Sequence, residues 1–538
     1  MTDRQEPRLA AWGRLTQGLD VLVIGGGITG AGIFHELALL GLSVGLLEQG
    51  DFASGTSSRS SKLIHGGLRY LKRLQLRITR AACRERDLLA LFNPHLVRPV
   101  RFLYPAYSQD PTPGWQVALG LTMYDHLTPF RHHHRRLRSE QVRRLVPQLA
   151  EDGLEFGLLY DDCVADDAQL TWAVVRAGIR AGGTALNYAR VEELVLNRQG
   201  MVAGVRVRDL EDGCLREIPA QVVVNATGVW CDQVRQLLGD LPARLRPSRG
   251  SHLLFPRERL PLSVAVTGLS PDDGRPVFAV PHPEGTLVGT TDVFHQGKLE
   301  DPRPSAEEVA YLMRYVQHAF PGAKLSLGDV CGSFAGVRPI VDLTAEEPSE
   351  ASREEAVWVE RGMVSTAGGK LTTFRVTAEE VVEEVVALLP EGSRPRISVS
   401  HLASMVLPDR LDSRQKEQLA RLGLAAVVME GLSRRLGASA LALTVGSPPE
   451  ALRPVEETFG ITPAEVLYHV RFSAVVHLSD LLLRRVRLGL WQPQRCLEVA
   501  EKLRPTIRRA LGWSLARWRR ELELLAREVE NWAPPEGL

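Results

Sequence analysis

The chain has 538 residues, of which 44% are hydrophobic and 24% charged, and these proportions exclude a disordered chain, a collagen-like fibre and a coiled-coil rod. Because 65 basic side chains face 64 acidic ones, the net charge is +1, and no overall field attracts nucleic acid as a partner. The six cysteines include no Cys-x-x-Cys pair, so we expect neither disulfides nor a metal site.

Length and apolar patterning predict a cytoplasmic protein of two or three domains, because 538 residues exceed what one hydrophobic core usually serves. The N-terminal segment lacks the apolar core of a signal peptide. No apolar run approaches the ~20 residues that a membrane-spanning helix needs.

The first recognisable unit is a βαβ pattern. Residues 20–24 form a short apolar run typical of a buried parallel strand, residues 31–40 predict an apolar helix, and residues 43–47 predict a second strand. A loop rich in Gly, Ser, Thr and Ala follows over residues 51–61, and helical patterning returns at about residues 75–92.

Between the first strand and the helix lies the motif Gly25-x-Gly27-x-x-Gly30, which in this context predicts a dinucleotide-binding loop. Gly25 permits the tight turn, Gly27 lets the backbone approach a pyrophosphate, and Gly30 lets helix and strand pack closely. The helix N-terminus then offers N–H groups to the phosphates. Glu48 ends the second strand, where an acidic side chain can accept a ribose hydroxyl. The alternative is a glycine-rich turn without a ligand.

Strands and helices alternate again further along the chain. Residues 201–208 and 214–218 are expected to pair across a turn, and residues 221–225 predict another buried strand. From 250 to 340 the pattern is mainly that of β-strands. Since a parallel and a more antiparallel region interleave, we expect an α/β fold in which a Rossmann-type cofactor domain contains an inserted, mainly β substrate domain.

After Pro395 the pattern changes to helix without strand, which predicts a C-terminal all-helical domain. One helix face is formed by Trp518, Leu522, Leu525, Val529 and Trp532. The expected division is 18–100, 160–248 and 355–395 for cofactor binding, 101–159 for a substrate and membrane side, 249–354 for a β-rich substrate-binding segment, and 400–538 for the helical domain.

Two later segments favour FAD over NAD as the cofactor. The strand 221–225 leads into Ala-Thr-Gly228, an ending typical of folds in which a later strand returns to FAD. Residues 365–374 precede an amphipathic helix, and their backbone N–H groups would face the negative charge of reduced flavin. The residues expected to supply these contacts are Gly369, Lys370, Leu371 and Thr372. Three segments that serve one long cofactor fit FAD better than NAD.

The motifs, in order, resemble those of the FAD-dependent, quinone-reducing (aerobic) glycerol-3-phosphate dehydrogenases. The most specific is the run Thr56–Leu71, which contains Ser-Ser-Lys-Leu-Ile-His-Gly-Gly-Leu-Arg-Tyr. The others are the segments 24–32, 123–127, 250–252, 289–292, 336–339 and 368–373. Thr29 and Phe374 depart from the family's usual Asn and Tyr, and we expect them to alter packing rather than the reaction.

The resemblance implies a D-amino-acid-oxidase-like fold with non-covalent FAD. It also implies a peripheral enzyme on the inner face of the plasma membrane that oxidises sn-glycerol 3-phosphate to dihydroxyacetone phosphate and reduces a membrane quinone. Nothing in the sequence decides between a monomer and a homodimer.

The resemblance also assigns roles to individual residues. His252 is the general base, and Arg338 acts in catalysis and binds the phosphate, for which the planar guanidinium of arginine is suited. The expected substrate-binding residues are Arg69, Tyr70, Arg338 and Lys370, and Ser60, Ser61 and Lys62 are expected to lie along the flavin. The alternatives are structural ion pairs for the two arginines and a core position for His252.

The region 117–144 is expected to touch the membrane. Its apolar part, 117–130, is followed by six arginines against one glutamate, namely Arg131, Arg135, Arg136, Arg138, Arg143 and Arg144 against Glu140. Such a cluster can hold a peripheral protein at an anionic leaflet. The alternatives are a solvated basic face and a funnel for a phosphorylated substrate.

Two other functions remain open at this point. An oxidase that acts on the same substrate with oxygen as the acceptor shares every motif. A flavin-binding RNA-modifying or regulatory protein should instead show a basic surface domain and lack the set of Arg69, His252 and Arg338.

Overall fold

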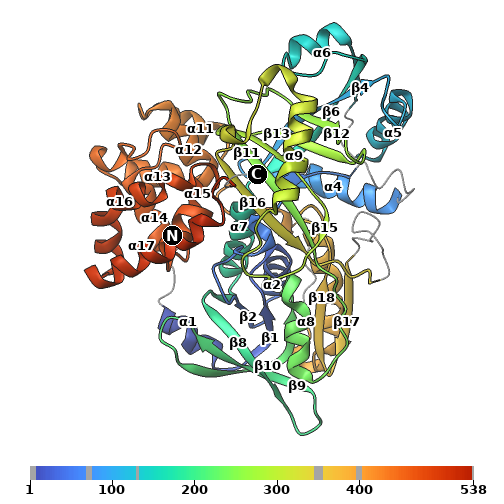
Figure 1. Ribbon diagram of the computed structural model, residues 1–538. Helices are drawn as coiled ribbons and strands as arrows, with labels where there is room; N and C mark the ends of the chain where they lie inside the picture. Colours follow the sequence, from blue (N-terminus) through green and yellow to red (C-terminus); the bar gives the residue numbers. More distant parts are fainter. Residues whose placement is uncertain (1–7, 68–75, 129–132, 344–354, 396–402, 536–538) are drawn as a thin grey trace.

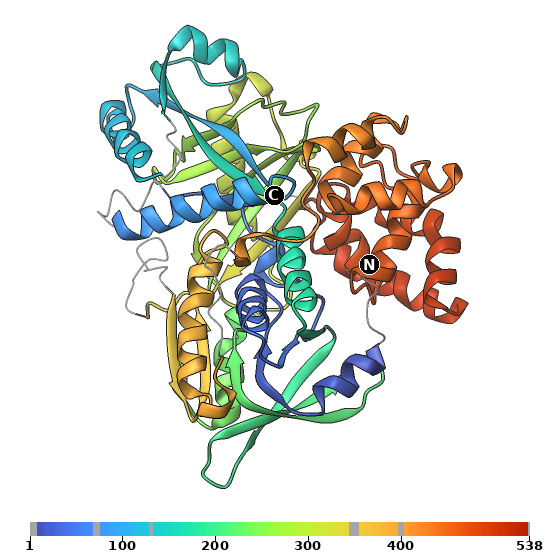
Figure 2. The same ribbon diagram turned by 180° about the vertical axis from the view of Figure 1, so that it is seen from behind.

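The computed structural model describes residues 8–67, 76–128, 133–343, 355–395 and 403–535. The chain builds two large sheets and a helical domain (Figure 1; Figure 2 from behind). The first sheet occupies the lower half of Figure 1 and the second the upper half, while the C-terminal helices lie to one side of both. Arg69, Tyr70 and Arg131 lie outside the described residues.

The first sheet has the strand order β17-β18-β10-β1-β2-β7. The strands are β1 (Leu19–Ile24), β2 (Val44–Leu47), β7 (Thr184–Leu186), β10 (Leu215–Asn225), β17 (Ala356–Glu360) and β18 (Met363–Ala367). From β18 to β7 every pairing is parallel, so the carboxyl ends of β1, β10 and β18 meet at one edge. β8 (Ala189–Leu196) and β9 (Val202–Asp209) extend this sheet through the antiparallel pairing of β9 with β10, which confirms the predicted hairpin.

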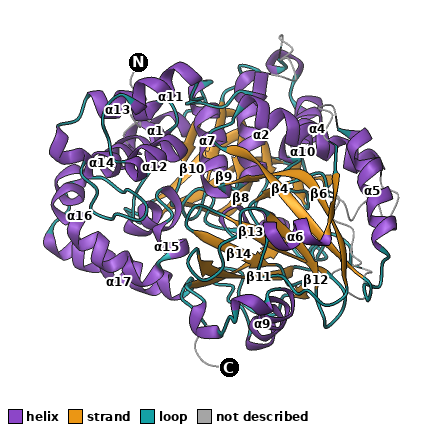
Figure 3. Cartoon of the chain, turned by 90° about the horizontal axis from the view of Figure 1, so that it is seen from above, coloured by secondary structure: helices purple, strands orange, loops and turns teal. Residues whose placement is uncertain are grey.

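Three helices cover one face of this sheet, with α2 in the middle (Figure 3). They are α2 (Ile28–Leu39), α7 (Asp167–Arg180) and α10 (Phe374–Leu388), and α2 begins three residues before the predicted helix because Gly27 is its N-cap. Glycines permit the close crossings. A Cβ at Gly178 of α7 would overlap the ring of Phe34, and one at Gly32 would lie 2.9 Å from the ring of Phe374.

The second sheet has the order β15-β11-β14-β13-β12-β4-β6-β3, with β16 paired to β11 and β5 to β6. Its strands are β3 (Leu63–Ile64), β4 (Val97–Tyr107), β5 (Arg135–Arg138), β6 (Leu154–Ala165), β11 (Ser248–Pro256), β12 (Ala265–Leu269), β13 (Pro276–Pro281), β14 (Gly285–Gly289), β15 (Val293–Phe294) and β16 (Gly332–Arg338). Helices α4 (Leu76–Phe92), α5 (Gly114–Leu127), α6 (Ser139–Leu145) and α9 (Ala306–Ala319) lie around it. The region 250–340 is thus mainly β, as predicted, apart from α9.

The C-terminal part is helical. It consists of α11 (Ser413–Ala420), α12 (Ala426–Leu436), α13 (Ser439–Val445), α14 (Pro463–Phe472), a π-helix (Asp480–Arg485), α15 (Leu488–Trp491), α16 (Cys496–Leu511) and α17 (Leu515–Glu530). Its hydrophobic core also contains Leu254, Leu287 and Phe334 of the second sheet, so the helices and that sheet share one core. In the described part of the chain, no helix is both long and apolar enough to cross a membrane.

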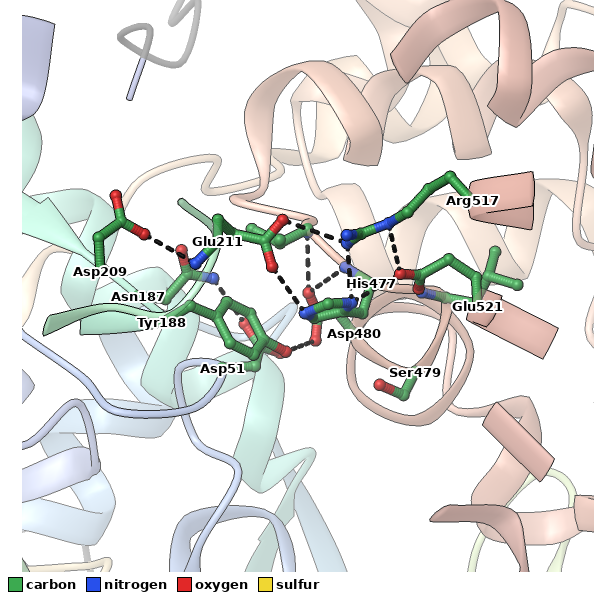
Figure 4. Close-up of polar contacts among 12 residues, drawn as sticks. Asp51, Asn187, Tyr188, Asp209, Glu211, His477, Ser479, Asp480, Arg517 and Glu521 are labelled. Atoms are coloured by element: carbon green, nitrogen blue, oxygen red, sulfur yellow. Dashed lines mark hydrogen bonds and ion pairs between the residues drawn. The ribbon is translucent and has the colours of Figure 1, made fainter. Parts of the chain in front are cut away.

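A polar seam joins the helical domain to the first sheet (Figure 4). Asp480 accepts the Tyr188 hydroxyl at 2.5 Å and the backbone N–H of His477 at 2.8 Å. The His477 imidazole lies between Glu521 of α17, at 2.9 Å, and Glu211 of the β9–β10 turn, at 3.3 Å. Burial alone would lower the pKa of His477, but hydrogen bonds to the two glutamates raise it to about 10. The imidazolium therefore bridges two domains at neutral pH.

The close crossing of α2 and α7 generates a test of the packing. Gly178→Ala should destabilise the protein by about 1–3 kcal/mol, because the new methyl group must displace the Phe34 ring in a filled core. Gly120→Ala in α5 is the control, since a Cβ there meets no atom within 4 Å. It should stabilise the protein by about 0.5–1 kcal/mol. Urea unfolding would measure both, and equal effects of the two substitutions would contradict this packing.

Candidate functional site

The glycine loop forms a cradle between β1 and α2. Gly25 has φ +111°, and a Cβ there would lie 2.5 Å from the carbonyl oxygen of Ala226. A Cβ on Gly30 would overlap the carbonyl oxygen of Gly25. Side chains are therefore excluded at both positions, which is the requirement of a turn that brings backbone N–H groups close to a pyrophosphate.

The N-terminus of α2 faces the loop that follows β2. The Ile28 N–H donates to the Ser57 hydroxyl at 2.9 Å, and a Cβ on Gly27 would lie only 3.2 Å from that oxygen. Ser57 was not among the residues predicted from the sequence, because nothing in the pattern of a serine-rich loop tells which hydroxyl returns to the helix.

Glu48 lies at the end of β2, next to the glycine loop. Its two carboxylate oxygens accept the backbone N–H groups of Gly26 and Gly50 at 2.7 and 2.8 Å. Burial raises the pKa of Glu48, and these two hydrogen bonds oppose the rise. The carboxylate is thus held in one orientation beside the cradle, and its remaining lone pairs can accept hydroxyl groups.

The segments after β10 and β18 lie at the same edge of the sheet, since both strands continue the parallel order from β1. After β10, Gly228 has φ +58°. After β18, Gly368 and Gly369 have φ +87° and +76°, and the chain turns through Lys370 into α10. The Thr372 hydroxyl accepts the His65 N–H at 3.1 Å, which joins this turn to the segment of the Ser-Ser-Lys run. The expected cofactor-binding segments therefore meet at one edge.

The residues Ser60 and Lys62 are bound to a carboxylate that the sequence did not identify. Asp167 of α7 is fully buried and accepts the Ser60 N–H at 3.0 Å, the Ser60 hydroxyl at 2.7 Å and the Lys62 ammonium at 2.8 Å. Arg487 of the helical domain donates to the same carboxylate at 3.0 Å. Burial lowers the pKa of Lys62 to about 8, and the positive charge of Arg487 adds to this effect.

His252 lies on β11, almost fully buried. Its Nε2 is 2.8 Å from the Ser61 hydroxyl, and its ring stacks on Phe334 with centroids 4.6 Å apart. Nδ1 has no hydrogen-bond partner among the described residues. Burial holds the pKa of His252 well below its usual value of 6.5, and the positive charges of Arg338 and Lys62 lower it further. The imidazole is therefore neutral at pH 7.

Arg338 lies on β16, which pairs with β11. Its guanidinium bonds Asp292 at 3.0 Å and the Thr290 hydroxyl at 3.0 Å, and it lies over Gly250, where a Cβ would overlap it. The ion pair that was the alternative interpretation of Arg338 is thus present. The pairing of β16 with β11, the Ser61–His252 hydrogen bond and the approach of Lys62 to the Phe334 ring that stacks on His252 nevertheless bring Arg338, His252, Ser61 and Lys62 into one region.

This arrangement defines a flavin-binding oxidoreductase fold, and comparisons with known proteins agree. The profile of the family described as FAD dependent oxidoreductase matches residues 20–383, and that of the C-terminal domain of alpha-glycerophosphate oxidase matches residues 407–518. A glycerol-3-phosphate dehydrogenase from Mycobacterium leprae is 36% identical over 544 residues, covering 98% of this chain and 90% of that protein.

Two further relatives extend the comparison. An aerobic glycerol-3-phosphate dehydrogenase from Bacillus subtilis is 37% identical over 376 residues, covering 69% of this chain and 67% of that protein. The crystal structure of the glycerol-3-phosphate dehydrogenase from Bacillus halodurans in complex with FAD superposes with a TM-score of 0.81 at 27% identity, with both chains covered completely. The chain belongs to the family of FAD-dependent glycerol-3-phosphate dehydrogenases, and FAD is its cofactor. The predicted family, fold class and cofactor are confirmed.

The buried neutral His252 generates a prediction about pH. Because its pKa is lower in the folded than in the unfolded protein, acid favours the unfolded state, which takes up the proton. Between pH 8 and pH 5 the wild type should therefore lose about 2 kcal/mol more stability than His252→Gln, which cannot titrate. Urea unfolding at the two pH values measures this difference. Other buried histidines are common to both proteins and cancel, and an equal loss in both would show that folding does not lower the pKa of His252.

Proposed function

We propose that the protein oxidises sn-glycerol 3-phosphate to dihydroxyacetone phosphate and passes the electrons to a membrane quinone. The names of the relatives support the substrate. The observation that carries the proposal is a neutral, buried imidazole, His252, on a strand adjacent to that of the guanidinium of Arg338. A neutral imidazole can accept a proton, and a guanidinium can bind a phosphate dianion.

The oxidation removes a hydride from C2 of the substrate and a proton from its hydroxyl group. Bound FAD supplies the two-electron acceptor. His252 accepts the proton, and Ser61 fixes the orientation of its ring. Arg338 binds the phosphate, with Lys370 and the residues Arg69 and Tyr70, which lie outside the described part of the chain, as further substrate-binding groups.

Phosphate binding also adjusts the base. An imidazole with a strongly lowered pKa is a weak base, and the charge of Arg338 is one cause of the lowering. A dianion against Arg338 offsets that positive charge and so raises the pKa of His252 towards neutrality, where a general base works best. Substrate binding thereby prepares the residue that takes its proton.

The cofactor contacts in this proposal are those expected from the sequence, and the FAD is held without a covalent bond. The glycine cradle would hold the pyrophosphate and Glu48 the ribose, since both lie at the edge where β1, β10 and β18 end. The backbone N–H groups of residues 369–372, in the turn between β18 and α10, would face the flavin.

A membrane surface is the partner that a quinone acceptor requires, and helix α5 supports this part of the proposal. Its side chains Trp115, Leu119 and Met123 are 63%, 56% and 37% exposed and lie four residues apart, on one face. Asp125, near the end of α5, bonds His134 at 2.8 Å, which places the basic strand β5 beside the helix. An apolar face next to arginines is the pattern of an interfacial anchor. The protein is expected to lie on the inner face of the plasma membrane.

Anaerobic addition of glycerol 3-phosphate should bleach the flavin absorbance of the purified protein, and acid precipitation should release the yellow colour into the supernatant.

Arg338→Met should lower kcat/KM by about one and a half to four decades, because loss of a charge-assisted pair in a desolvated site costs about 2–5 kcal/mol. Turnover of unphosphorylated glycerol should fall far less.

The matched control for Arg338→Met is the double variant with Asp292→Asn, which leaves no orphaned carboxylate. It should regain stability but not activity. If the flavin of the wild type stays oxidised, glycerol 3-phosphate is not the substrate. If Arg338→Met lowers turnover of glycerol 3-phosphate and of glycerol equally, Arg338 does not bind the phosphate. Stoichiometric peroxide in air would favour oxygen over quinone as the acceptor.

Charge reversal at Arg135 and Arg138 should weaken flotation of the protein with anionic vesicles, because each arginine near an anionic leaflet contributes about 1 kcal/mol. Arg136 stays unchanged because it stacks on Phe156 at 3.9 Å. Quinone reduction should slow while turnover with a soluble dye persists. Reversal at the exposed Arg519 and Arg520 of α17 is the control and should have no effect. Vesicle binding that survives the first reversal but not the second would place the contact on the helical domain. A dimer that buries the α5 face would appear as a doubled mass in solution.

A further inference from the structure

One short segment of the helical domain, residues 480–487, reaches into the FAD-binding part beside the loop that follows β2. It carries three arginines, Arg484, Arg485 and Arg487, each no more than 5% exposed. The π-helix gives this segment a wide turn, and Arg487 has a left-handed backbone with φ +61°. Every one of the three guanidiniums bonds a carboxylate that lies outside the helical domain.

The segment holds the loop 51–62 at both ends. At the first end, Asp51 accepts Arg484 at 2.6 Å and both terminal nitrogens of Arg485 at 2.9 and 2.8 Å. At the second end, Arg487 donates to the Ser58 carbonyl oxygen at 3.3 Å and to Asp167 at 3.0 Å. Between these ends lies Ser57, which bonds the N-terminus of α2.

Asp167 transmits the contact of Arg487 to the neighbouring residues of the loop. One of its oxygens accepts both the N–H and the hydroxyl of Ser60, and the other accepts Lys62 and Arg487. Burial alone would raise the pKa of Asp167, but the charges of Lys62 and Arg487 lower it, so the carboxylate stays ionised. An ionised, fully buried carboxylate fixes the positions of its donors because none of them can be replaced by water.

The backbone at Lys62 then directs Ser61 to the opposite side. Lys62 has φ +58°, a conformation that costs a non-glycine residue about 1–2 kcal/mol and persists only where its surroundings hold it. With Lys62 turned towards Asp167, the Ser61 hydroxyl lies 2.8 Å from His252. The orientation of the imidazole thus depends on a chain of contacts that begins in the helical domain.

We propose that Arg487 is a positioning residue, through which the C-terminal helical domain holds the loop 51–62 and thereby sets the orientation of Ser61 and His252. The inference rests on the proposed role of His252 as the base. It gives the helical domain a function in the reaction: the active-site loop is complete only when the segment 480–487 is docked.

The test compares Arg487→Gln with Arg487→Lys, which restores the charge, and with Arg434→Gln as the matched control. Arg434 also joins the helical domain to the second sheet, through Glu284, but its bonds do not reach the loop 51–62. Stopped-flow reduction of the flavin by glycerol 3-phosphate should slow about ten- to hundredfold in Arg487→Gln at saturating substrate, the loss expected for a displaced catalytic group. Half-saturation by substrate should change little, and Arg487→Lys should recover most of the rate.

Two readouts do not depend on the substrate. Arg487→Gln should weaken FAD binding and alter the fluorescence of the bound flavin, whereas Arg434→Gln should change neither. If the wild-type flavin is not reduced by glycerol 3-phosphate, the proposed function fails while these two measurements still test the positioning of the loop. Unchanged FAD affinity and reduction rate in Arg487→Gln would overturn the inference, and so would equal losses in Arg434→Gln.

A second variant tests the last link even if Arg487→Gln folds poorly. Ser61→Ala removes only the hydroxyl that bonds His252, and it should slow flavin reduction to a similar extent. Combined with Arg487→Gln, it should give little loss beyond that of Ser61→Ala alone, since the effects of residues in one chain of contacts are not additive. Fast flavin reduction in Ser61→Ala would show that the Ser61 hydroxyl does not position His252.

Discussion

A carboxylate without solvent contact can remain charged only where donors surround it, and this requirement at Asp167 organises the centre of the molecule. Its two oxygens gather hydrogen bonds from the Ser60–Lys62 loop, from its own helix and from Arg487. Removing one partner of such a buried set costs about 3–5 kcal/mol, because an uncompensated charge is left behind. Three segments far apart in the sequence therefore have to come together for any of them to be stable in this position.

The same requirement explains why buried ion pairs attach the helical domain to the FAD-binding part. Asp51 is a second buried carboxylate, paired with Arg484 and Arg485, and Asp167 takes one of its two counter-charges from Arg487 of the same segment. Apolar packing supplies the rest, since Phe334 belongs to the core of the helical domain while its ring also stacks on His252. A domain that could be taken from its pattern for an independent unit is therefore continuous with the wall of the site.

Local patterns in the sequence were sufficient to predict the glycine cradle and much of the first sheet. The glycine loop, Glu48 and the parallel strands could be predicted because each follows from the spacing of neighbouring residues, and close packing enforces that spacing at Gly25 and Gly30. Asp167 could not be found in this way. It follows Asp166, the N-cap of α7, so the pair resembles an ordinary acidic helix start.

The partner of Asp167 is even less visible in the sequence. Arg487 is one of many arginines and lies 320 residues away along the chain. No periodicity connects the two, and the π-helical turn and the left-handed backbone that aim the guanidinium have no distinct sequence pattern. For Arg338 the sequence left two interpretations open. The motif around it predicted a phosphate ligand, whereas the many arginines of the chain made a structural ion pair the alternative. The bond to Asp292 is compatible with both.

The contact between the helical domain and the loop 51–62 is polar for a physical reason. Apolar packing would stabilise the docked helical domain equally well, but it is non-directional, and side chains in an apolar contact can slide without a large cost. Hydrogen bonds to a charged group fix distance and angle together. Proton transfer from a bound alcohol needs an acceptor held to within a fraction of an ångström, and the left-handed Lys62 needs a restraint on its side chain. A buried ion pair provides both, which is a reason for this fold to place arginines rather than leucines where the helical domain meets the loop.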